Sequence, residues 1–351
     1  MRDSIALMQA AVNRSLQLIV LPTEACNFRC VYCYESFQYK RMEEWVVRGI
    51  KSLITRRAGR LDRLLLSWFG GEPLLARDII EEVLGHTHAV ARTQERLEVR
   101  SEITTNGYLL TPPVFARLVS LGVAEYQISL DGPKHVHDRK RVLAGGRGTF
   151  DRIWENLLAM RESPYAFQVI VRLHADRENV AFLPSFLREY AAELGGDSRY
   201  ELYLRPIGRF GGPNDHLLPI LEDEEVDGVV GGLKAEASRL GLRQFDVSRD
   251  SDVCYAARAN SFVVRANGRL NKCTLALEHP ANQVGHIEED GSLRIDSGMI
   301  APWLRGLFSG DREELACPMM GLAEPRGMEG TSREIPLVAG ARSAPVTATV
   351  S

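Results

Sequence analysis

Three cysteines within eight residues, near the start of the chain, are the residues with the clearest capacity for chemistry. Cys26, Cys30 and Cys33 are separated by three and then two residues. Thiolates grouped this closely usually hold a metal. A structural zinc site takes four ligands, and the nearest histidine, His86, lies far along the chain. Three thiolates instead suit a cubane iron–sulfur cluster with one iron left open, while an incomplete zinc site or buried thiols are the alternatives.

The other three cysteines, Cys254, Cys273 and Cys317, are spread through the last third of the sequence. Six cysteines could form three disulfides, but a reducing compartment and a chain of this length make such bridges unnecessary. Free cysteine is also a common core residue, so simple burial is the plainest interpretation of these three.

The segments around these residues alternate between short apolar runs and longer helical patterns. This order predicts a parallel sheet, either doubly wound or curled into part of a β/α barrel. The expected strands cover 16–21, 63–69, 98–104, 124–130, 167–174 and 200–205, and the expected helices cover 43–55, 78–91, 113–121, 150–161 and 180–194.

Polar and glycine-rich motifs follow three of these strands directly. Residues 70–73 (GGEP) come after the second strand, 105–107 (TNG) after the third and 131–133 (DGP) after the fourth. The carboxyl ends of parallel strands meet at one edge of the sheet, where active sites gather in such folds. We therefore expect these motifs and the cysteine loop to face one cavity.

The later part of the chain has a different character. A connecting helix is expected over 222–240, and turns at 266–268 and 290–291 indicate a small β-rich appendage. The sequence thus divides into an N-terminal extension, a barrel, a connecting helical segment, an appendage and a loosely ordered tail. Their expected bounds are 1–15, 16–210, 211–253, 254–323 and 324–351.

Composition excludes several classes of partner. The 351 residues contain 43 Lys and Arg against 46 Asp and Glu, so no basic excess is available for nucleic acid or an anionic membrane. No run of 18 apolar residues predicts a transmembrane helix, and the N-terminus lacks the pattern of a signal peptide. We expect a cytoplasmic protein.

The segment from Cys26 to Cys33 resembles the CxxxCxφC signature of radical SAM enzymes. The resemblance implies that the three cysteines hold a [4Fe–4S] cluster whose open iron binds S-adenosylmethionine (SAM). Reductive cleavage of SAM then gives a 5′-deoxyadenosyl radical that abstracts hydrogen from a substrate. Tyr32 occupies the position where the family places an aromatic residue near the adenine.

Other motifs fall in the order that this family shows, and together they cover most of 16–210. The GGEP and TNG motifs are similar to family motifs, and the SLDG run with a downstream arginine resembles a pair that contacts the ribose and carboxylate of SAM. The residues that this resemblance implies for SAM binding are Tyr32, Gly70, Gly71, Glu72, Pro73, Thr105, Asn106, Ser129, Asp131 and Arg141.

The spacing from Cys254 through Gly268 to Cys273 resembles the CxnGx4C opening of SPASM and twitch extensions, which house auxiliary iron–sulfur clusters. A full SPASM domain would continue with a further cysteine array, and this chain offers only Cys317. The resemblance implies a single auxiliary cluster held by Cys254, Cys273 and Cys317.

The domain pair resembles maturases of ribosomally made peptides (RiPPs). The expected function is hydrogen abstraction from a side chain of a precursor peptide, followed by a C–C or C–heteroatom crosslink. Sulfatase-type maturation is disfavoured because Thr274 stands where those enzymes carry an aspartate. A MoaA-like nucleotide cyclase, a twitch-type dehydrogenase and a non-catalytic sensor are the alternatives, and no catalytic base is assigned.

Two protein partners follow from this interpretation. Only about 15 residues precede the first expected strand, far fewer than a domain needs, so a separate leader-binding protein could present the peptide. The cluster also needs an electron donor, such as a flavodoxin or a ferredoxin.

Overall fold

The computed structural model describes residues 10–11, 13–245 and 253–322. The expected tail at 324–351 and most of the expected extension at 1–15 lie outside the described residues. None of the described helices is both long and apolar enough to cross a bilayer.

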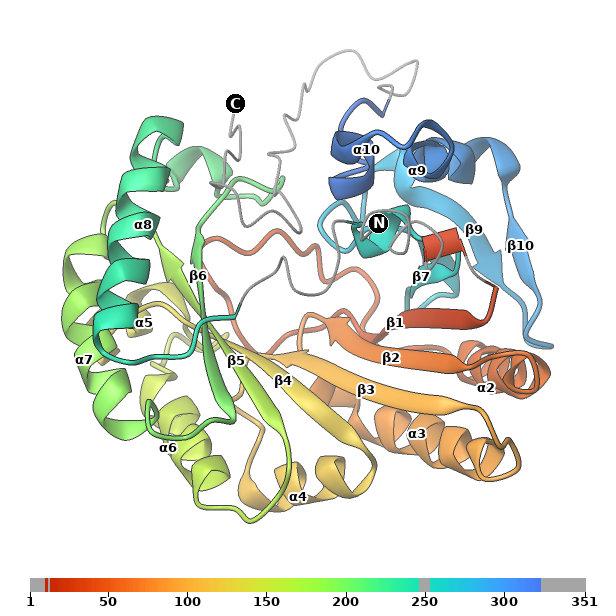
Figure 1. Ribbon diagram of the computed structural model, residues 1–351, viewed down its shortest axis with the longest axis horizontal. Coiled ribbons are helices and arrows are strands. Elements are labelled where there is room, and N and C mark those ends of the chain that lie inside the picture. The colour runs from red at the N-terminus through yellow and green to blue at the C-terminus, as the bar shows by residue number, and fades with distance from the viewer. Residues whose placement is uncertain (1–9, 12, 246–252, 323–351) are drawn as a thin grey trace.

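Six parallel strands, in the order of the sequence, form the barrel part of the fold (Figure 1). Their helices lie on the outer face of the curved sheet. This arrangement confirms the partial barrel. The strands are β1 (Ser15–Thr23), β2 (Arg63–Gly70), β3 (Glu98–Thr105), β4 (Val123–Leu130), β5 (Gln168–Ala175) and β6 (Tyr200–Pro206). The helices are α2 (Glu44–Ala58), α3 (Arg77–Ala91), α4 (Pro112–Ser120), α5 (Lys134–Lys140), α6 (Phe150–Arg161), α7 (Leu183–Glu193) and α8 (Asp223–Arg239).

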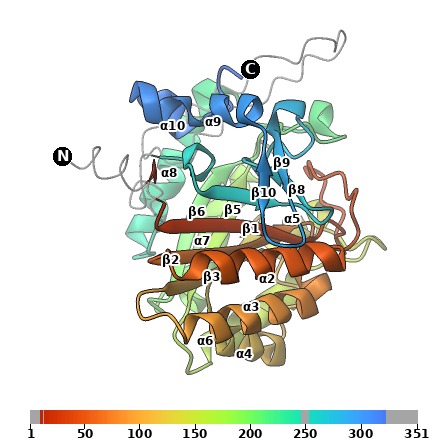
Figure 2. The ribbon, with the colours of Figure 1, turned by 90° about the vertical axis from the view of Figure 1, so that its right-hand side faces the viewer.

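Successive side chains along each strand point to opposite faces of the sheet. In β4, the apolar residues Tyr126, Ile128 and Leu130 belong to the core beneath the helices. The residues between them, Gln127 and Ser129, therefore face the concave side. In α2 the buried residues recur at helical spacing, and Figure 2 shows α2 and α3 side by side along the outside of the sheet.

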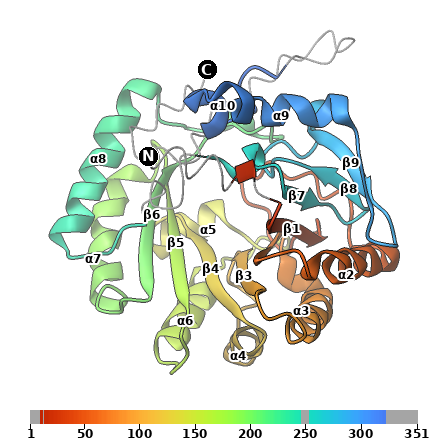
Figure 3. The same cartoon turned by 45° about the vertical axis from the view of Figure 1, so that its right-hand side comes forward.

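The sheet continues beyond β1 into the C-terminal part of the chain (Figure 3). Strand β7 (Ser261–Val264) pairs in parallel with β1, and β8 (Arg269–Asn271), β9 (Gln283–Ile287) and β10 (Leu293–Ile295) follow as antiparallel neighbours. The turns expected at 266–268 and 290–291 join β7 to β8 and β9 to β10. The expected appendage is thus an extension of the barrel sheet, completed by α9 (Ser297–Ser309) and α10 (Arg312–Ala316).

A buried ion pair fastens this extension to the end of β1. The Arg265 guanidinium donates to both carboxylate oxygens of Glu24 at 2.9 and 2.7 Å, and each side chain is only 1% exposed. Arg265 also donates to Glu278 at 2.6 Å. Because Glu24 lies two residues before Cys26, the extension helps to fix the start of the cysteine loop.

Three helical details differ from the expected ones. The helix expected over 180–194 begins as a 3-10 turn at Val180–Phe182, and α7 starts at Leu183 because Pro184 fits only the first turn of a helix. Helix α5 is only seven residues long, too short for a periodic pattern to reveal it. Helices α9 and α10 were also not expected from the sequence.

Candidate functional site

The cysteine loop is held in place by backbone pairing with a segment that follows α5. The amide of Arg29 donates to the Val142 carbonyl at 2.8 Å, and the amide of Val31 donates to the Lys140 carbonyl at 2.9 Å. This pairing brings the loop after β1 next to the loop after β4. As a result, the three cysteines and Arg141, which are far apart in sequence, lie in one place.

The three thiols of this loop are half-buried. The Cys26 sulfur accepts a hydrogen bond from the Phe28 amide at 3.3 Å, and the Cys33 amide donates to the Cys30 carbonyl at 3.1 Å. Burial raises the pKa of Cys26 and of Cys33 to about 12, and it also raises that of Cys30. The free thiols are therefore protonated at neutral pH, and metal binding must release their protons.

No three or more His, Cys, Asp or Glu side chains converge on a single-ion position anywhere in the described ranges. Ligands of one zinc ion must all lie about 2.0–2.3 Å from the same point. In a four-iron cluster each cysteine binds a different iron, so the sulfurs need not meet at one point. The loop is therefore compatible with a cluster.

Gly70 and Gly71 allow the end of β2 to pass against the chain that leads into the cysteine loop. A Cβ at Gly71 would lie 2.6 Å from the carbonyl oxygens of Glu24 and Ala25. Gly70 has a φ of 118°, and a Cβ there would meet the Thr23 oxygen at 2.2 Å. Both glycines are therefore required by close backbone approach.

Glu72 is fully buried and links the two glycine motifs. Its carboxylate accepts hydrogen bonds from the Leu74 amide at 3.0 Å, the Thr105 hydroxyl at 2.7 Å and the Asn106 amide at 2.7 Å. Burial raises the pKa of Glu72, although these three donors oppose the shift. In this structure Glu72 positions the TNG loop, and Pro73 begins the 3-10 turn that follows.

Asn106 in turn reaches the cysteine loop. Its side-chain amide donates to Asn27 Oδ1 at 2.8 Å, and the same nitrogen lies 4.0 Å from the Cys26 sulfur. The connection from Glu72 through Asn106 to Asn27 ties the ends of β2 and β3 to the first cysteine.

A second polar network joins Tyr32 to the ends of β4 and β5. Arg141 donates to the Tyr32 hydroxyl at 2.8 Å, and this hydroxyl donates to Asp131 Oδ2 at 2.8 Å. His174 Nδ1 lies 2.9 Å from Asp131 Oδ1, so a neutral ring with its proton on Nδ1 completes the network. Burial lowers the pKa of His174 to about 4. Burial alone would raise the pKa of Asp131, but the His174 hydrogen bond and the Arg141 charge hold it below its usual range.

Arg141 has a buried hydrogen-bonding atom without a partner. The residue is 7% exposed, and its buried Nε has no hydrogen-bond partner. An unsatisfied buried donor on a charged group is costly, so a ligand atom is its natural partner. Ser129 is also buried at this edge and accepts a hydrogen bond from Arg172 Nε at 3.2 Å. The three cysteine sulfurs are suitable ligands for an iron–sulfur cluster, and the unpartnered Nε–H of the neighbouring arginine can donate a hydrogen bond to the carboxylate of SAM.

The later cysteines come together around the start of β7 and the end of α10. Cys273 is buried, and the amide of Cys254 donates to the Leu315 carbonyl, two residues before Cys317, at 2.8 Å. Burial raises the pKa of Cys254 to about 12 and that of Cys273 to about 11, and neighbouring thiols add to both shifts.

Asn282 organises the loop that carries Cys273. Its carbonyl oxygen accepts from the amides of Lys272 and Cys273, and its amide group donates to the carbonyls of Cys273 and Ala276, all at 2.8 to 3.0 Å. The side chain is completely buried. The loop conformation therefore depends on one side chain.

Sequence reasoning assigned no role in these sites to His174, Asn27 or Asn282. Asn27 stands between two cysteines of the motif, and His174 ends a strand, so position alone gave a weak signal for both. Their partners lie far away in sequence and become apparent only once the register of β4 and β5 is known.

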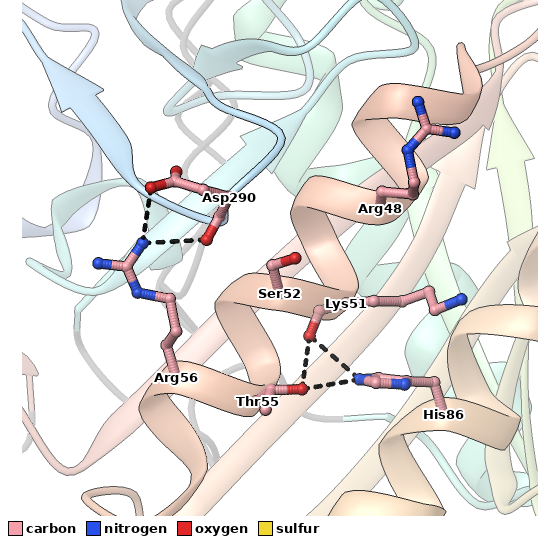
Figure 4. A pocket seen from close by; sticks show the side chains of 7 residues that line it. All are labelled: Arg48, Lys51, Ser52, Thr55, Arg56, His86 and Asp290. Carbon is pink, nitrogen blue, oxygen red and sulfur yellow. Dashed lines mark hydrogen bonds and ion pairs between the residues drawn. The ribbon is translucent and has the colours of Figure 1, made fainter.

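A pocket on the outer side of α2 is separate from both cysteine groups (Figure 4). It is rich in basic side chains, but the guanidinium of Arg56 bonds to Asp290, and Lys51 and Arg48 form ion pairs with Glu82 and Glu289. The positive charges of Arg48, Lys51 and Arg56 are therefore already paired with carboxylates of the protein. Its lining residues are Arg48, Lys51, Ser52, Thr55, Arg56, His86 and Asp290.

Comparison with known proteins shows similarity to one superfamily and to several named proteins. Residues 20–174 match the model of the radical SAM superfamily. The chain is 29% identical over 199 residues to the AdoMet-dependent heme synthase of Methanosarcina barkeri, which covers 56% of this chain and 52% of that protein. It is 32% identical over 206 residues to the mycofactocin maturase MftC of Mycolicibacterium smegmatis, covering 58% and 48%.

The fold also matches a solved structure described as native anSMEcpe with bound AdoMet and Kp18Cys peptide. The TM-score is 0.65 at 17% identity, and the match covers 83% of this chain and 84% of that chain. At this identity the likeness shows the fold alone. The chain spans about half the length of the curated relatives it matches.

Proposed function

The chain belongs to the radical SAM superfamily through residues 20–174, and from this premise we propose that it modifies a side chain of a ribosomally made precursor peptide. The observation that carries the proposal is the meeting of Cys26, Cys30 and Cys33 with Arg141, whose buried Nε has no partner. Similarity to a peptide maturase supports a peptide as the substrate class.

When bound, the [4Fe–4S] cluster and SAM supply a 5′-deoxyadenosyl radical that takes a hydrogen atom from the substrate. In this proposal the three loop cysteines hold the cluster, and Arg141 and Ser129 contact the carboxylate and ribose of SAM. Glu72 and Asn106 connect the loops after β2 and β3 to each other and to the cysteine loop. Tyr32 and His174 both bond to Asp131, and Arg141 donates to the Tyr32 hydroxyl, so this network orients the Arg141 guanidinium.

We assign a single auxiliary cluster to Cys254, Cys273 and Cys317 in the segment 254–323. The barrel would then span 16–210 and the connecting segment 211–253. Crosslink formation removes two hydrogens from the peptide, so one further electron and one proton must leave after the hydrogen atom. A cluster held by these three cysteines would accept that electron. A separate leader-binding protein and a flavodoxin or ferredoxin are proposed partners.

The assignment of the two sites is tested by iron content and uncoupled SAM cleavage after anaerobic reconstitution. About eight irons per chain are expected in wild type and about four in the Cys26/Cys30/Cys33 triple-alanine variant. Cys30→Ala should abolish cleavage, and Cys273→Ala should lose about four irons while still cleaving SAM. Retained cleavage in Cys30→Ala would refute the radical SAM site, and unchanged iron in Cys273→Ala would refute the auxiliary cluster.

The peptide substrate needs its own test. Precursor-peptide candidates incubated with the reduced enzyme and SAM should lose about two mass units if a crosslink forms. Deuterium at the attacked carbon should appear in 5′-deoxyadenosine. A product of unchanged mass with solvent hydrogen incorporated would instead indicate a redox-neutral reaction.

A small-molecule substrate is the second candidate. The similarity to a heme synthase, 29% identical over 199 residues, is comparable with that to the maturase, 32% identical over 206 residues. Under this alternative no peptide would be altered, and turnover would require a low-molecular-weight acid or nucleotide.

A further inference from the structure

Two arginines on the inner face of the last barrel strands have no acidic partner. The β5–β6 register pairs Arg172 with Tyr203, two residues before Arg205, so the side chains of both arginines lie on the concave face of the sheet. Both are half-buried. Arg172 donates to the Ser129 hydroxyl at 3.2 Å, and Arg205 donates to the Tyr203 hydroxyl at 2.6 Å. No carboxylate in the described part of the chain forms an ion pair with either.

This lack of an acidic partner contrasts with two other buried cations of the molecule. Lys140 is paired with Asp176, and Arg265 is paired with Glu24. Burial lowers the pKa of Arg172, the Tyr34 hydroxyl opposes that shift, and the charge of Arg205 adds to it. Two like charges held close together without a counter-ion destabilise the protein unless an anion binds.

The pair lies beside the proposed SAM site. Tyr34 directly follows Cys33 in the cysteine loop, and its ring packs edge-on against Phe210, which follows Arg205 beyond the end of β6, with the ring centres 5.7 Å apart. Ser129, the acceptor for Arg172, belongs to the proposed SAM site. A group bound by the two arginines would thus lie next to the place where hydrogen is abstracted.

We propose that Arg172 and Arg205 bind a carboxylate of the substrate and so position it beside the cofactor. This inference rests on the proposed function, since the substrate is taken to be a peptide. One guanidinium can hold both oxygens of a carboxylate while the other adds a further charged hydrogen bond. A nucleoside triphosphate carries more negative charge than two arginines neutralise. The carboxylate belongs either to an Asp or Glu side chain or to the free C-terminus, and the experiment distinguishes these sources.

The probe is a pair of synthetic nonapeptide mixtures, randomised at every position, one ending in a free acid and the other in an amide. Each mixture is equilibrated with the reconstituted, SAM-loaded full-length protein, and the retained peptides are sequenced by mass spectrometry. The variants are Arg205→Met, Arg205→Lys and Arg172→Met. Arg177→Met is the matched control, since Arg177 is an exposed arginine just beyond β5 that is paired with Glu225. Uncoupled SAM cleavage and the thermal unfolding midpoint are measured for each.

Wild type is expected to retain carboxylate-bearing peptides preferentially. Enrichment of Asp or Glu in the amide mixture identifies a side chain, and enrichment confined to the acid mixture identifies the C-terminus. Arg205→Met should lower this enrichment about tenfold or more, which corresponds to the loss of one charged hydrogen bond. Arg205→Lys should keep part of it, and Arg177→Met should match wild type. Uncoupled cleavage should stay within about twofold of wild type in Arg205→Met.

Three results would overturn the inference. Retained peptides could show no preference for carboxylates, or the preference could survive in both Arg205→Met and Arg172→Met. Loss of uncoupled cleavage in Arg205→Met would assign this arginine to SAM instead. If wild type retains no peptide from either mixture, the peptide function fails together with the inference. Binding of GTP that depends on Arg205 would then show that the pair serves a nucleotide phosphate.

Discussion

Replacing Gly71 by alanine should disturb the cysteine loop through backbone contact alone. The added Cβ would lie 2.6 Å from two carbonyl oxygens and 2.8 Å from the Ala25 carbonyl carbon, whereas ordinary contacts begin at 3.4 Å. These are backbone atoms, which cannot rotate away as a side chain could. Either the end of β2 or the segment leading to Cys26 must therefore move by several tenths of an ångström.

The magnitude follows from two opposing effects. Overpacking of this kind costs about 1–3 kcal/mol. Replacing glycine by alanine also restricts the unfolded chain, which stabilises the folded state by about 0.4–1 kcal/mol. Gly85→Ala is a matched control, because Gly85 lies exposed in α3 with nothing within 4 Å of the added Cβ. At this position only the stabilising effect of alanine applies, and its higher helix propensity should raise the free energy of unfolding by about 0.5–1 kcal/mol.

The assay is equilibrium urea unfolding of the reduced apo-protein, followed by iron content after reconstitution. Gly85→Ala should raise the unfolding free energy slightly and bind iron like wild type. Gly71→Ala should fall at least about 1 kcal/mol below the control variant and bind less iron at the first site. Equal unfolding free energies in the two variants would show that the close approach of β2 to residues 24–25 does not constrain the loop.

Three further predictions concern other parts of the molecule. Arg265→Met leaves the Glu24 carboxylate buried without its partner, so it should lower the free energy of unfolding, measured with urea, by about 3–5 kcal/mol. The double variant Arg265→Met and Glu24→Met removes both charges and should recover part of this loss. Asn282→Ala removes the four hydrogen bonds around Cys273 and should cost about 2–4 kcal/mol together with the auxiliary iron. Asn282→Asp should not recover this loss, because a carboxylate oxygen would then face the carbonyl oxygens of Cys273 and Ala276. Burial lowers the pKa of His137 to about 4, so the unfolded chain binds its proton first as pH falls. Stability should therefore decrease between about pH 6.5 and 4, and His137→Gln should show a shallower decrease in urea midpoint over that range.

The barrel strands could be predicted from the sequence because each one is a short apolar run, and three of them are followed directly by a glycine-containing turn motif. The cysteine motif is equally local, with three ligands in a single loop. The network of Tyr32, Asp131 and His174 could not be predicted in this way, because it depends on which residues of β4 and β5 lie opposite each other.

The C-terminal strands show the same limit. Their turns were visible in the sequence, but the parallel pairing of β7 with β1 joins residues more than 240 positions apart. No local pattern carries that information. The buried Arg265–Glu24 pair became apparent only after this pairing placed the two residues together.

The pairing of β7 with β1 has a consequence for how the chain could be shortened. Without β7, the strand Ser15–Thr23 would be an open edge, with unpaired amide and carbonyl groups along an apolar, β-prone run. Such an edge is a template for association with other chains. A fragment that lacks the C-terminal strands should therefore aggregate even if its helices and remaining strands form correctly. In related chains of different length, some other segment would have to shield the same side of β1.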